Sequence, residues 1–192
     1  MNMKPTDILI KEHEAILLML QILEAVSTRL ENGRDVKPEH LPRIVEFFRV
    51  FADKCHHGKE ENLLFGAMIK AGLPEKNGPV AVMLMEHETG RDFVGKMDTA
   101  AAAYAGGDRT QVDHFIHNAR RYIALLSQHI QKENRILFPM ADRLIPPEEQ
   151  SRLSAGFDKI ETEIIGEGTH ERFHEWLHAL KSEYLMSANE KI

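Results

Sequence analysis

Cysteine is almost absent from this sequence, since Cys55 is the single one among 192 residues. A lone cysteine excludes an intramolecular disulfide, and no secretory hydrophobic segment is present at the start, so we expect a cytoplasmic protein. Long apolar runs are also missing, which argues against a membrane span. There is no surplus of basic charge either: the formal net charge is −6 and the pI is about 6.0, which argues against nucleic acid as a partner.

Glycine and proline are sparse and gather at a few breaks, at residues 33–38, 72–79, 106–107 and 146–147. Between these breaks no segment shows the alternation typical of a strand. We predict helices at residues 6–31, 39–70, 79–104, 109–142 and 147–165, and a last one starting near Thr169. Four long helices joined by short loops predict an all-α fold, an up-down-up-down four-helix bundle over residues 1–145. Residues 146–192 are predicted to form a C-terminal helical extension packed on it.

Histidine is what the sequence has in excess, with eleven residues. One histidine lies in the apolar stripe of each of the four long helices: His13, His56, His87 and His129. In the second and fourth helices a glutamate follows one helical turn later, as His56–Glu60 and His129–Glu133. The stripe of the fourth helix reads Tyr122, Leu126, His129, Glu133, Ile136 and Met140.

An internal repeat relates the two halves of the chain. The triplet Glu-His-Glu occurs at residues 12–14 and again at 86–88, and HHGKEENLLF (56–65) matches HIQKENRILF (129–138). The chain therefore looks like a duplicated helical hairpin. This register favours His56 with Glu60 over the neighbouring pair of His57 with Glu61, because His57 aligns with Ile130. His57 is still not excluded as a ligand, since it lies three residues before Glu60.

The repeated pattern points four imidazoles and two carboxylates at one interior. Buried groups of this kind are costly unless they are paired or bind a metal. A dinuclear centre satisfies them, with the histidines as terminal ligands and Glu60 and Glu133 bridging the two ions. Histidine and carboxylate ligands without thiolate suit iron, with manganese or zinc as substitutes. For any one of these histidines alone, a hydrogen-bonded role in the core is the alternative.

At these residues the sequence resembles the hemerythrin-like, or HHE cation-binding, family. The segments EHEAILLML, CHHGKEENLLF, GPVAVMLMEHETGR and HIQKENRILFPMA carry the resemblance over about residues 6–142. It implies a four-helix bundle whose non-haem di-iron centre is held by His13, His56, Glu60, His87, His129 and Glu133. Hemerythrins have a further histidine four residues after the one on the third helix, where this chain has Arg91. One iron-sensing relative instead uses the residue after the second-helix histidine, so His57 is our candidate for the additional ligand.

The resemblance implies a protein that binds or senses oxygen, nitric oxide, peroxide or iron. A di-iron redox enzyme that decomposes peroxide, or that repairs or supplies iron centres, is the alternative, and the sequence leaves open whether the chain is an enzyme. We expect a small molecule as the partner. Any homodimer is expected to form through the exposed face of the last helix.

Several other residues carry competing signals. HEWLH (174–178) matches a zinc-protease pattern, but no third ligand or cleft is evident, so we predict a packing helix whose apolar face is Trp176, Leu177 and Leu180. We expect Cys55 to be a buried filler rather than a reactive thiol. Solvated faces are predicted for three histidines, His40, His114 and His117. Glu14, Glu88 and Tyr122 are candidates for a layer that orients the ligands, with a solvated position as the alternative for the two glutamates.

Overall fold

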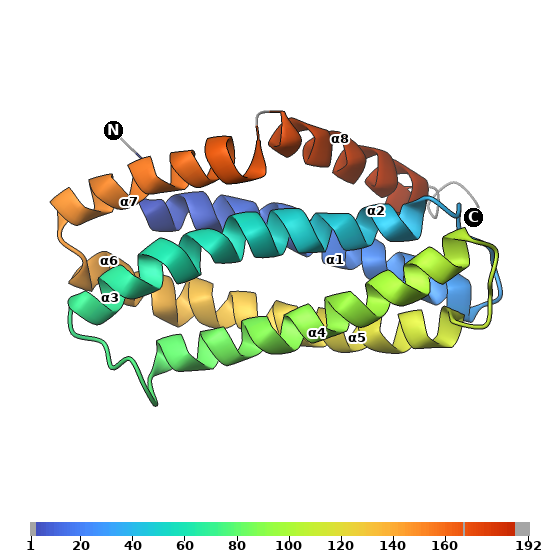
Figure 1. Cartoon of the computed structure of the whole chain (residues 1–192), viewed down its shortest axis with the longest axis horizontal. Helices are drawn as coiled ribbons and strands as arrows, with labels where there is room; N and C mark the ends of the chain where they lie inside the picture. Colours follow the sequence, from blue (N-terminus) through green and yellow to red (C-terminus); the bar gives the residue numbers. More distant parts are fainter. Residues whose placement is uncertain (1–2, 167, 187–192) are drawn as a thin grey trace.

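The computed structural model describes residues 3–166 and 168–186, and every regular element in this part is helical. Four antiparallel segments form a bundle (Figure 1). The first is α1 (Pro5–Glu31), and the third is α4 (Pro79–Ala105). The second comprises α2 (His40–Phe47), η1 (Phe48–His57), η2 (Glu60–Leu64) and α3 (Phe65–Lys70), and the fourth α5 (Val112–Lys132), η3 (Glu133–Leu137) and α6 (Phe138–Leu144). The predicted all-α, up-down-up-down bundle is thereby confirmed.

The second and fourth segments differ from the unbroken α-helices predicted at residues 39–70 and 109–142. Each contains π-helical turns, the η segments, in which a backbone N–H bonds to the carbonyl five residues earlier. One extra residue per turn shifts the inward face along the chain. After Glu133 the buried side chain is therefore Leu137, whereas Ile136 is 55% exposed. The predicted position of Ile136 on the interior stripe is wrong for this reason.

The C-terminal extension consists of α7 (Pro147–Lys159), η4 (Ile160–Ile165), α8 (Thr169–Lys181) and η5 (Ser182–Met186). These helices follow one another along the side of the bundle formed by α1 and the second segment (Figure 1). Gly166 and Gly168 both have positive φ angles, which lets the chain turn between η4 and α8. Phe157, Phe173 and Leu177 are buried against the bundle. Residues 187–192 of the predicted extension lie outside the described residues.

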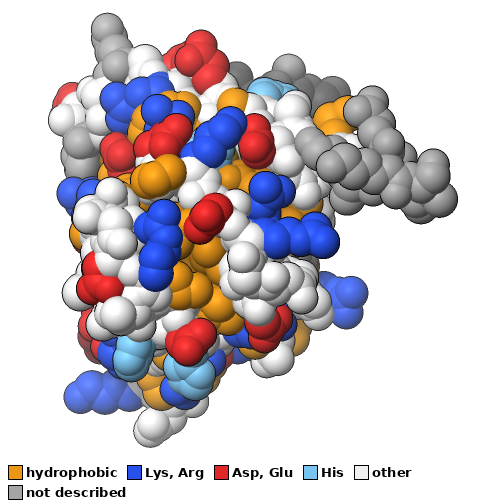
Figure 2. Space-filling view, turned by 90° about the vertical axis from the view of Figure 1, so that its right-hand side faces the viewer, with side chains coloured by type: hydrophobic (Ala, Val, Ile, Leu, Met, Phe, Trp, Pro, Cys, Tyr) orange, Lys and Arg blue, Asp and Glu red, His pale blue; other side chains and the backbone are white. Residues whose placement is uncertain are grey.

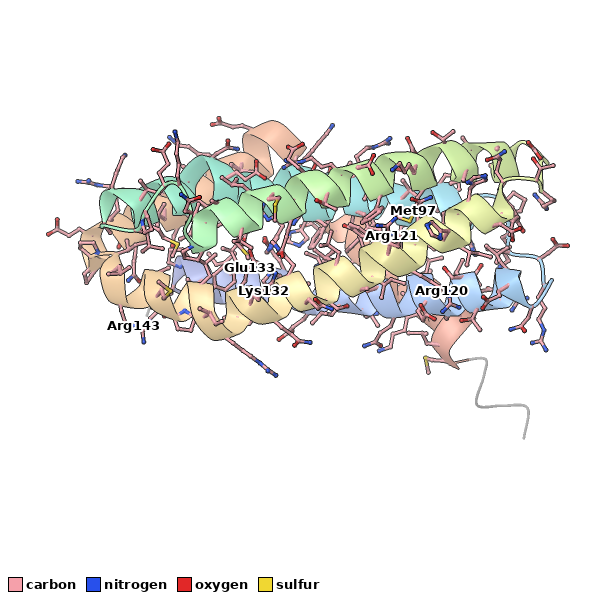
Figure 3. The ribbon with its side chains drawn as sticks, turned by 90° about the horizontal axis from the view of Figure 1, so that it is seen from below. Met97, Arg120, Arg121, Lys132, Glu133 and Arg143 are labelled. Carbon is pink, nitrogen blue, oxygen red and sulfur yellow. The ribbon has the colours of Figure 1, made fainter. Side chains whose placement is uncertain are left out.

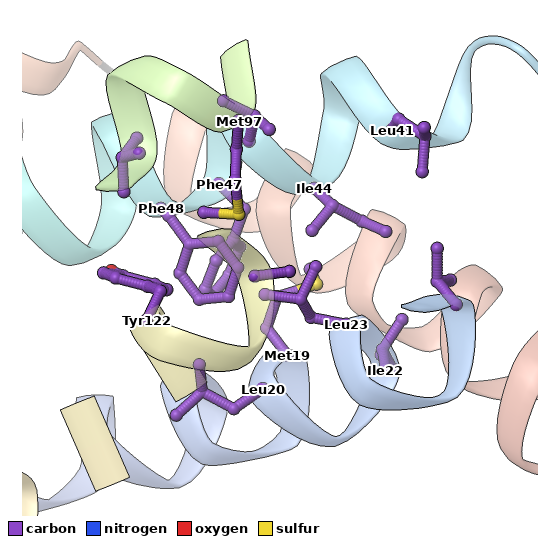
Figure 4. Close-up of a cluster of buried hydrophobic side chains, with 14 of the residues drawn as sticks. Met19, Leu20, Ile22, Leu23, Leu41, Ile44, Phe47, Phe48, Met97 and Tyr122 are labelled. Atoms are coloured by element: carbon purple, nitrogen blue, oxygen red, sulfur yellow. The ribbon is translucent and has the colours of Figure 1, made fainter. Parts of the chain in front are cut away.

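Two apolar clusters fill the bundle on either side of a polar layer. The larger one joins α1, α2, α4, α5 and α8, and Figure 4 shows part of it, including Met19, Leu23, Phe47, Phe48, Met97 and Tyr122. The smaller one joins the other end of the bundle to α7 and includes Leu9, Leu64, Met83, Phe138 and Phe157. Along each of the four segments, the stripe histidine lies between residues of the two clusters. The polar layer is therefore enclosed by packed apolar side chains.

The surface is consistent with the balanced composition. The end of the bundle seen in Figure 2 mixes Lys and Arg with Asp and Glu, without a broad patch of one sign. None of the described helices combines the length and hydrophobicity that crossing a bilayer requires.

Candidate metal centre

Seven side chains meet in the polar layer, and none of them is more than 4% exposed. They are the seven singled out from the sequence: His13, His56, His57, Glu60, His87, His129 and Glu133. Figure 3 shows Glu133 between the helices, next to Lys132 on the same segment. Together the four segments of the bundle supply five imidazoles and two carboxylates to one enclosed space.

The seven side chains form two overlapping groups. The first cluster is His13, His56, Glu60 and Glu133, and the second cluster is His57, Glu60, His87 and His129. Within each cluster one ligand-type atom from every residue lies within 4.8 Å of the others. That spacing allows one cation per cluster to be surrounded by imidazole nitrogens and carboxylate oxygens.

Glu60 and Glu133 connect the two clusters. One oxygen of Glu60 faces His56 Nε2 at 3.6 Å, and its other oxygen faces His87 Nε2 at 3.5 Å. Likewise, Glu133 faces His13 Nε2 at 3.2 Å with one oxygen and His129 Nε2 at 3.1 Å with the other. Each carboxylate thus presents one oxygen to each cluster, which is the arrangement that bridging ligands require.

The outer ring nitrogen of every histidine in the centre faces an oxygen acceptor. His56 Nδ1 lies 2.8 Å from Glu12 Oε2, and His129 Nδ1 lies 2.8 Å from Glu86 Oε2. Glu12 and Glu86 are in turn held by Lys59 and Lys132, which the repeat aligns. An Nδ1–H that donates to a carboxylate leaves the Nε2 lone pair free to bind a metal.

The other two stripe histidines are held across the repeat. His13 Nδ1 donates to Asn134 Oδ1 at 2.8 Å, and His87 Nδ1 donates to Glu61 Oε1 at 2.6 Å. Asn134 follows Glu133 and Glu61 follows Glu60, so the two residues occupy equivalent positions in the two hairpins. Each hairpin therefore orients a histidine of the other.

His57 is held by an arrangement without a counterpart in the second half. Its Nδ1 lies 3.3 Å from Asp53 Oδ1. Arg91, at the position where hemerythrins carry a further histidine, contacts Asp53 at 2.9 Å and Glu61 at 2.6 Å. Arg91 thus holds the two carboxylates that orient His57 and His87, while His57 supplies the additional imidazole.

Most of the inward-facing atoms lack hydrogen-bond partners, whereas Nε2 of His87 and Nε2 of His129 lie 3.1 Å from each other. In the described part of the chain, no hydrogen bond satisfies Nε2 of His13, His56 or His57, or any side-chain oxygen of Glu60 or Glu133. The oxygens of Glu60 and Glu133 lie 3.1–3.6 Å from imidazole nitrogens, but these contacts do not have the geometry of hydrogen bonds. Buried polar atoms of this kind are costly without a partner. Cations would satisfy these atoms, and the set of imidazole and carboxylate donors suits divalent transition metals.

Burial sets the protonation of these groups. Burial and the nearby His13 lower the pKa of His56 to about 4, and burial with His87 lowers the pKa of His57 well below its usual value. Both imidazoles are therefore neutral at neutral pH, as metal ligands must be. Burial and the charge of Glu133 raise the pKa of Glu60, because two enclosed carboxylates cannot both stay charged without a cation between them.

The layer that orients the ligands differs from the one predicted. Glu14 is exposed and Glu88 contacts Arg91, whereas Glu12 and Glu86 hold the histidines. The repeat does not distinguish these glutamates, because the triplet Glu-His-Glu preserves Glu14 with Glu88 as well as Glu12 with Glu86. Tyr122 is buried beside the second cluster and packs against Phe48.

The remaining residues with competing signals take structural roles. His114 and His117 are exposed as predicted, but His40 is buried and its Nδ1 lies 2.6 Å from the Tyr184 hydroxyl, because η5 covers the start of α2.

Cys55 is buried, and burial raises its pKa to about 12, which suits a filler rather than a reactive thiol. In the described residues, the tail histidines join no group of three or more ligand-type side chains. There α8 packs through Phe173, Leu177 and Leu180, with Trp176 half-buried.

Comparisons with known proteins found sequence relatives and a matching family model. An uncharacterized protein of Mycobacterium tuberculosis and one of Mycobacterium bovis are each 23% identical to this chain over 159 residues. The aligned region covers 83% of this chain but 62% of theirs, so the chain spans less than two thirds of those relatives. No solved structure matches the chain. Residues 4–141 match the hemerythrin HHE cation binding domain, and the chain therefore belongs to that family.

Proposed function

We propose that the two clusters hold a pair of iron ions and that the protein binds or senses a small oxidant or diatomic molecule, namely oxygen, nitric oxide or peroxide. The observation that carries this proposal is the convergence of unpartnered imidazole and carboxylate atoms on two adjacent clusters. Glu60 belongs to both clusters, and Glu133 faces His13 of the first and His129 of the second. Mixed nitrogen and oxygen ligands without thiolate favour iron, and manganese and zinc are the substitutes. When bound there, a pair of ferrous ions would supply an open coordination site for a small molecule and the electrons to reduce an oxidant.

The protein's own contribution is to hold the ligands and exclude water. The Nδ1 contacts set the orientation of the five rings before a cation arrives, which reduces the cost of assembling the site. The two apolar clusters enclose the layer on both sides. The C-terminal extension also contacts the surroundings of the first cluster. Glu161 of η4 contacts the Lys59 ammonium, which in turn holds Glu12, the acceptor of His56.

A redox enzyme is the second candidate function, and one observation favours it. A cavity of about 280 Å³ extends between η1, α4 and α5 and is lined by His57, His87 and His129 of the second cluster. A route of this kind lets reactants and products exchange during turnover. Continuous consumption of peroxide in proportion to bound iron would identify an enzyme, whereas a single stoichiometric reaction would identify a binder or sensor.

Metal analysis tests the main proposal most directly. The purified chain is expected to contain one iron for each cluster. Its absorption spectrum in the near ultraviolet should change when air reaches the reduced protein. A chain that takes up only a single zinc ion, with no spectral response to air, would contradict the proposal.

A further inference from the structure

The cavity beside the second cluster has features that the proposed function does not use. Its lining runs from the buried His57, His87 and His129 to the half-exposed side chains of Arg49 and Asp98, between η1, α4 and α5. The proposed small oxidants contain two to a few atoms. An engineered cavity of about 150 Å³ already holds benzene, and about 300 Å³ is the lower end of typical ligand pockets. At about 280 Å³, the cavity has room for an organic molecule of at least one ring.

The walls of the cavity are mainly apolar. The side chains of Phe48, Val94, Tyr122, Leu125 and Leu126 form them. The rings of Tyr122 and Phe48 make an edge-to-face contact, with ring centres 4.9 Å apart, and together form an aromatic part of the wall. An apolar wall of this kind favours a ligand that buries carbon rather than a hydrated ion.

The charged residues around the cavity are already paired. Arg49 contacts Asp98 at 3.0 Å and Arg91 contacts Asp53 at 2.9 Å. Glu86 is held by Lys132 and by His129. No charge of this lining is left to balance a charged ligand, so desolvating one here would be costly. The lining therefore selects for an uncharged molecule.

Two glycines of α4 line the cavity, of which Gly90 is buried and Gly95 is exposed. A Cβ atom at Gly90 would lie 3.4 Å from the Tyr122 ring, and a larger side chain would extend into the space beside it. Gly95 also lines the cavity, and a Cβ atom there would meet nothing within 4 Å. Glycine within a helix costs about 1 kcal/mol relative to alanine, so the space is maintained against helix propensity.

We propose that this cavity binds a small, uncharged, mainly apolar organic molecule of about the size of one substituted ring, placed against the histidines of the second cluster. The proposal deepens the proposed function, because it assigns a class of organic ligand to the same centre. It requires only binding and makes no claim about a chemical step.

The test is calorimetric titration of the full metal-loaded chain with p-cresol, an uncharged single-ring probe. Gly90→Leu and Gly95→Phe are expected to weaken binding by about tenfold or more, equivalent to about 1.4 kcal/mol. The first adds a side chain at a buried position of the lining, and the second adds a bulky ring at an exposed one. Gly66→Phe is the matched control: Gly66 is also helical with free space around its Cβ, but it lies outside the lining. This control should bind like the unaltered chain.

Metal content measured on the same samples separates this proposal from the previous one. If p-cresol at millimolar concentration gives no binding to a chain that retains its metal, the ligand proposal is wrong while the metal centre stands. Unchanged affinity in both glycine variants would also overturn it. Binding of p-cresol by a chain that never takes up iron would instead leave the cavity site intact and contradict the iron centre.

Discussion

His57 is the residue at which the two halves of the centre differ most. Its equivalent in the second hairpin is Ile130, yet His57 is 4% exposed and lies in the second cluster with His87 and His129. In an α-helix, neighbouring side chains point about 100° apart, so consecutive residues seldom face one interior. The π-helical turns of η1 have more residues per turn and reduce that angle, which lets His56 and His57 face one polar layer.

His57→Ala tests this assignment. The second cluster would lose one of three imidazoles while the first cluster keeps all its residues, so we expect one of the two ions to be lost. Iron per chain, measured by mass spectrometry of the metal, gives the answer. His114→Ala is the matched control, because His114 is exposed and distant from the centre. An iron content that His57→Ala leaves unchanged would show that His57 is not a ligand.

Glu60 and Glu61 are adjacent but contact the centre in different ways. Glu60 is fully buried with both oxygens unpartnered, whereas Glu61 orients His87 through its Nδ1. Glu60→Ala removes a bridge common to both clusters and should abolish binding of both ions. Glu61→Ala removes an orienting contact and should weaken metal affinity by about 10- to 100-fold. Equal losses in a competition titration with a chelator would refute the bridging role.

His40 allows a test of stability against pH away from the metal centre. Burial lowers its pKa, and the nearby charged groups are those of Lys37, Glu39, Arg43 and Glu183. Since the folded state binds the proton less readily than the unfolded state, the His40 contribution is present above about pH 6.5 and is lost as the pH falls below it. Chemical unfolding should show that the unaltered chain loses more stability on acidification than His40→Asn does. Parallel curves for the two proteins would argue against this.

The identity of the inward residues was predictable, but the identity of their acceptors was not. Stripe spacing and the repeat point to His13, His87 and the two His-x-x-x-Glu pairs, because ligands must recur on one helical face. The acceptors of their Nδ1 atoms depend on distances between helices. Glu12 rather than Glu14 lies beside His56, and no pattern within one helix reveals which glutamate does so.

At the scale of elements, the second and fourth segments were predicted as continuous α-helices, whereas the structure interrupts them with π-helical turns. A wide turn leaves no signature of glycine or proline, so the segments at residues 39–70 and 109–142 read as continuous helices. Three of the wide segments, η1, η2 and η3, contain His56, His57, Glu60 and Glu133. Wide turns of this kind are frequent at functional sites. As a local result of the wide turn in η3, Leu137 rather than Ile136 is the side chain that faces the interior.

The C-terminal extension reaches the first cluster through a series of side chains. Glu161 of η4 contacts Lys59, Lys59 contacts Glu12, and Glu12 orients His56. The equivalent lysine of the second hairpin, Lys132, contacts Glu86 but keeps 37% of its side chain exposed. The extension therefore supports one half of the centre and leaves the other half without this cover.

Lys59→Met and Lys132→Met form a matched pair that tests this difference. Removing Lys59 leaves Glu12 buried without its cation, a change that typically costs about 3–5 kcal/mol, so we expect lower stability and weaker metal binding. Lys132→Met should have a much smaller effect, because water can still reach Glu86 at the partly exposed position of Lys132. Urea unfolding and metal content measure both. Similar losses in the two variants would contradict the supporting role of the extension.

At the scale of the whole molecule, metal and fold should be linked. The centre lies between the two apolar clusters and draws ligands from all four segments, so a bound ion joins every segment of the bundle. Ligands that bind only the folded state stabilise it by about 3–4 kcal/mol at 100 to 1,000 times the dissociation constant.

Chelation should therefore lower the thermal midpoint measured by circular dichroism. Readdition of ferrous iron should restore it, and magnesium should not, because magnesium prefers oxygen ligands. A midpoint that does not respond to iron would show that the centre contributes nothing to folding.

The architecture was more accessible from the sequence than its details. Long amphipathic segments separated by short breaks at residues 33–38, 72–79 and 106–107 allow few arrangements other than an antiparallel bundle. The course of α7 and α8 along the bundle could not be predicted in the same way. It depends on matching surfaces, such as Phe157 and Phe173 against different apolar clusters, rather than on a pattern within either helix.

The exchange of orienting contacts between the hairpins bears on how such a chain could originate. Asn134 of the second hairpin holds His13 of the first, and Glu61 of the first holds His87 of the second. Two separate copies of one ancestral hairpin, related by a twofold axis, could make the same reciprocal contacts. Joining those copies end to end would give a chain of this layout. His57 opposite Ile130 then marks a place where one former subunit diverged from the other.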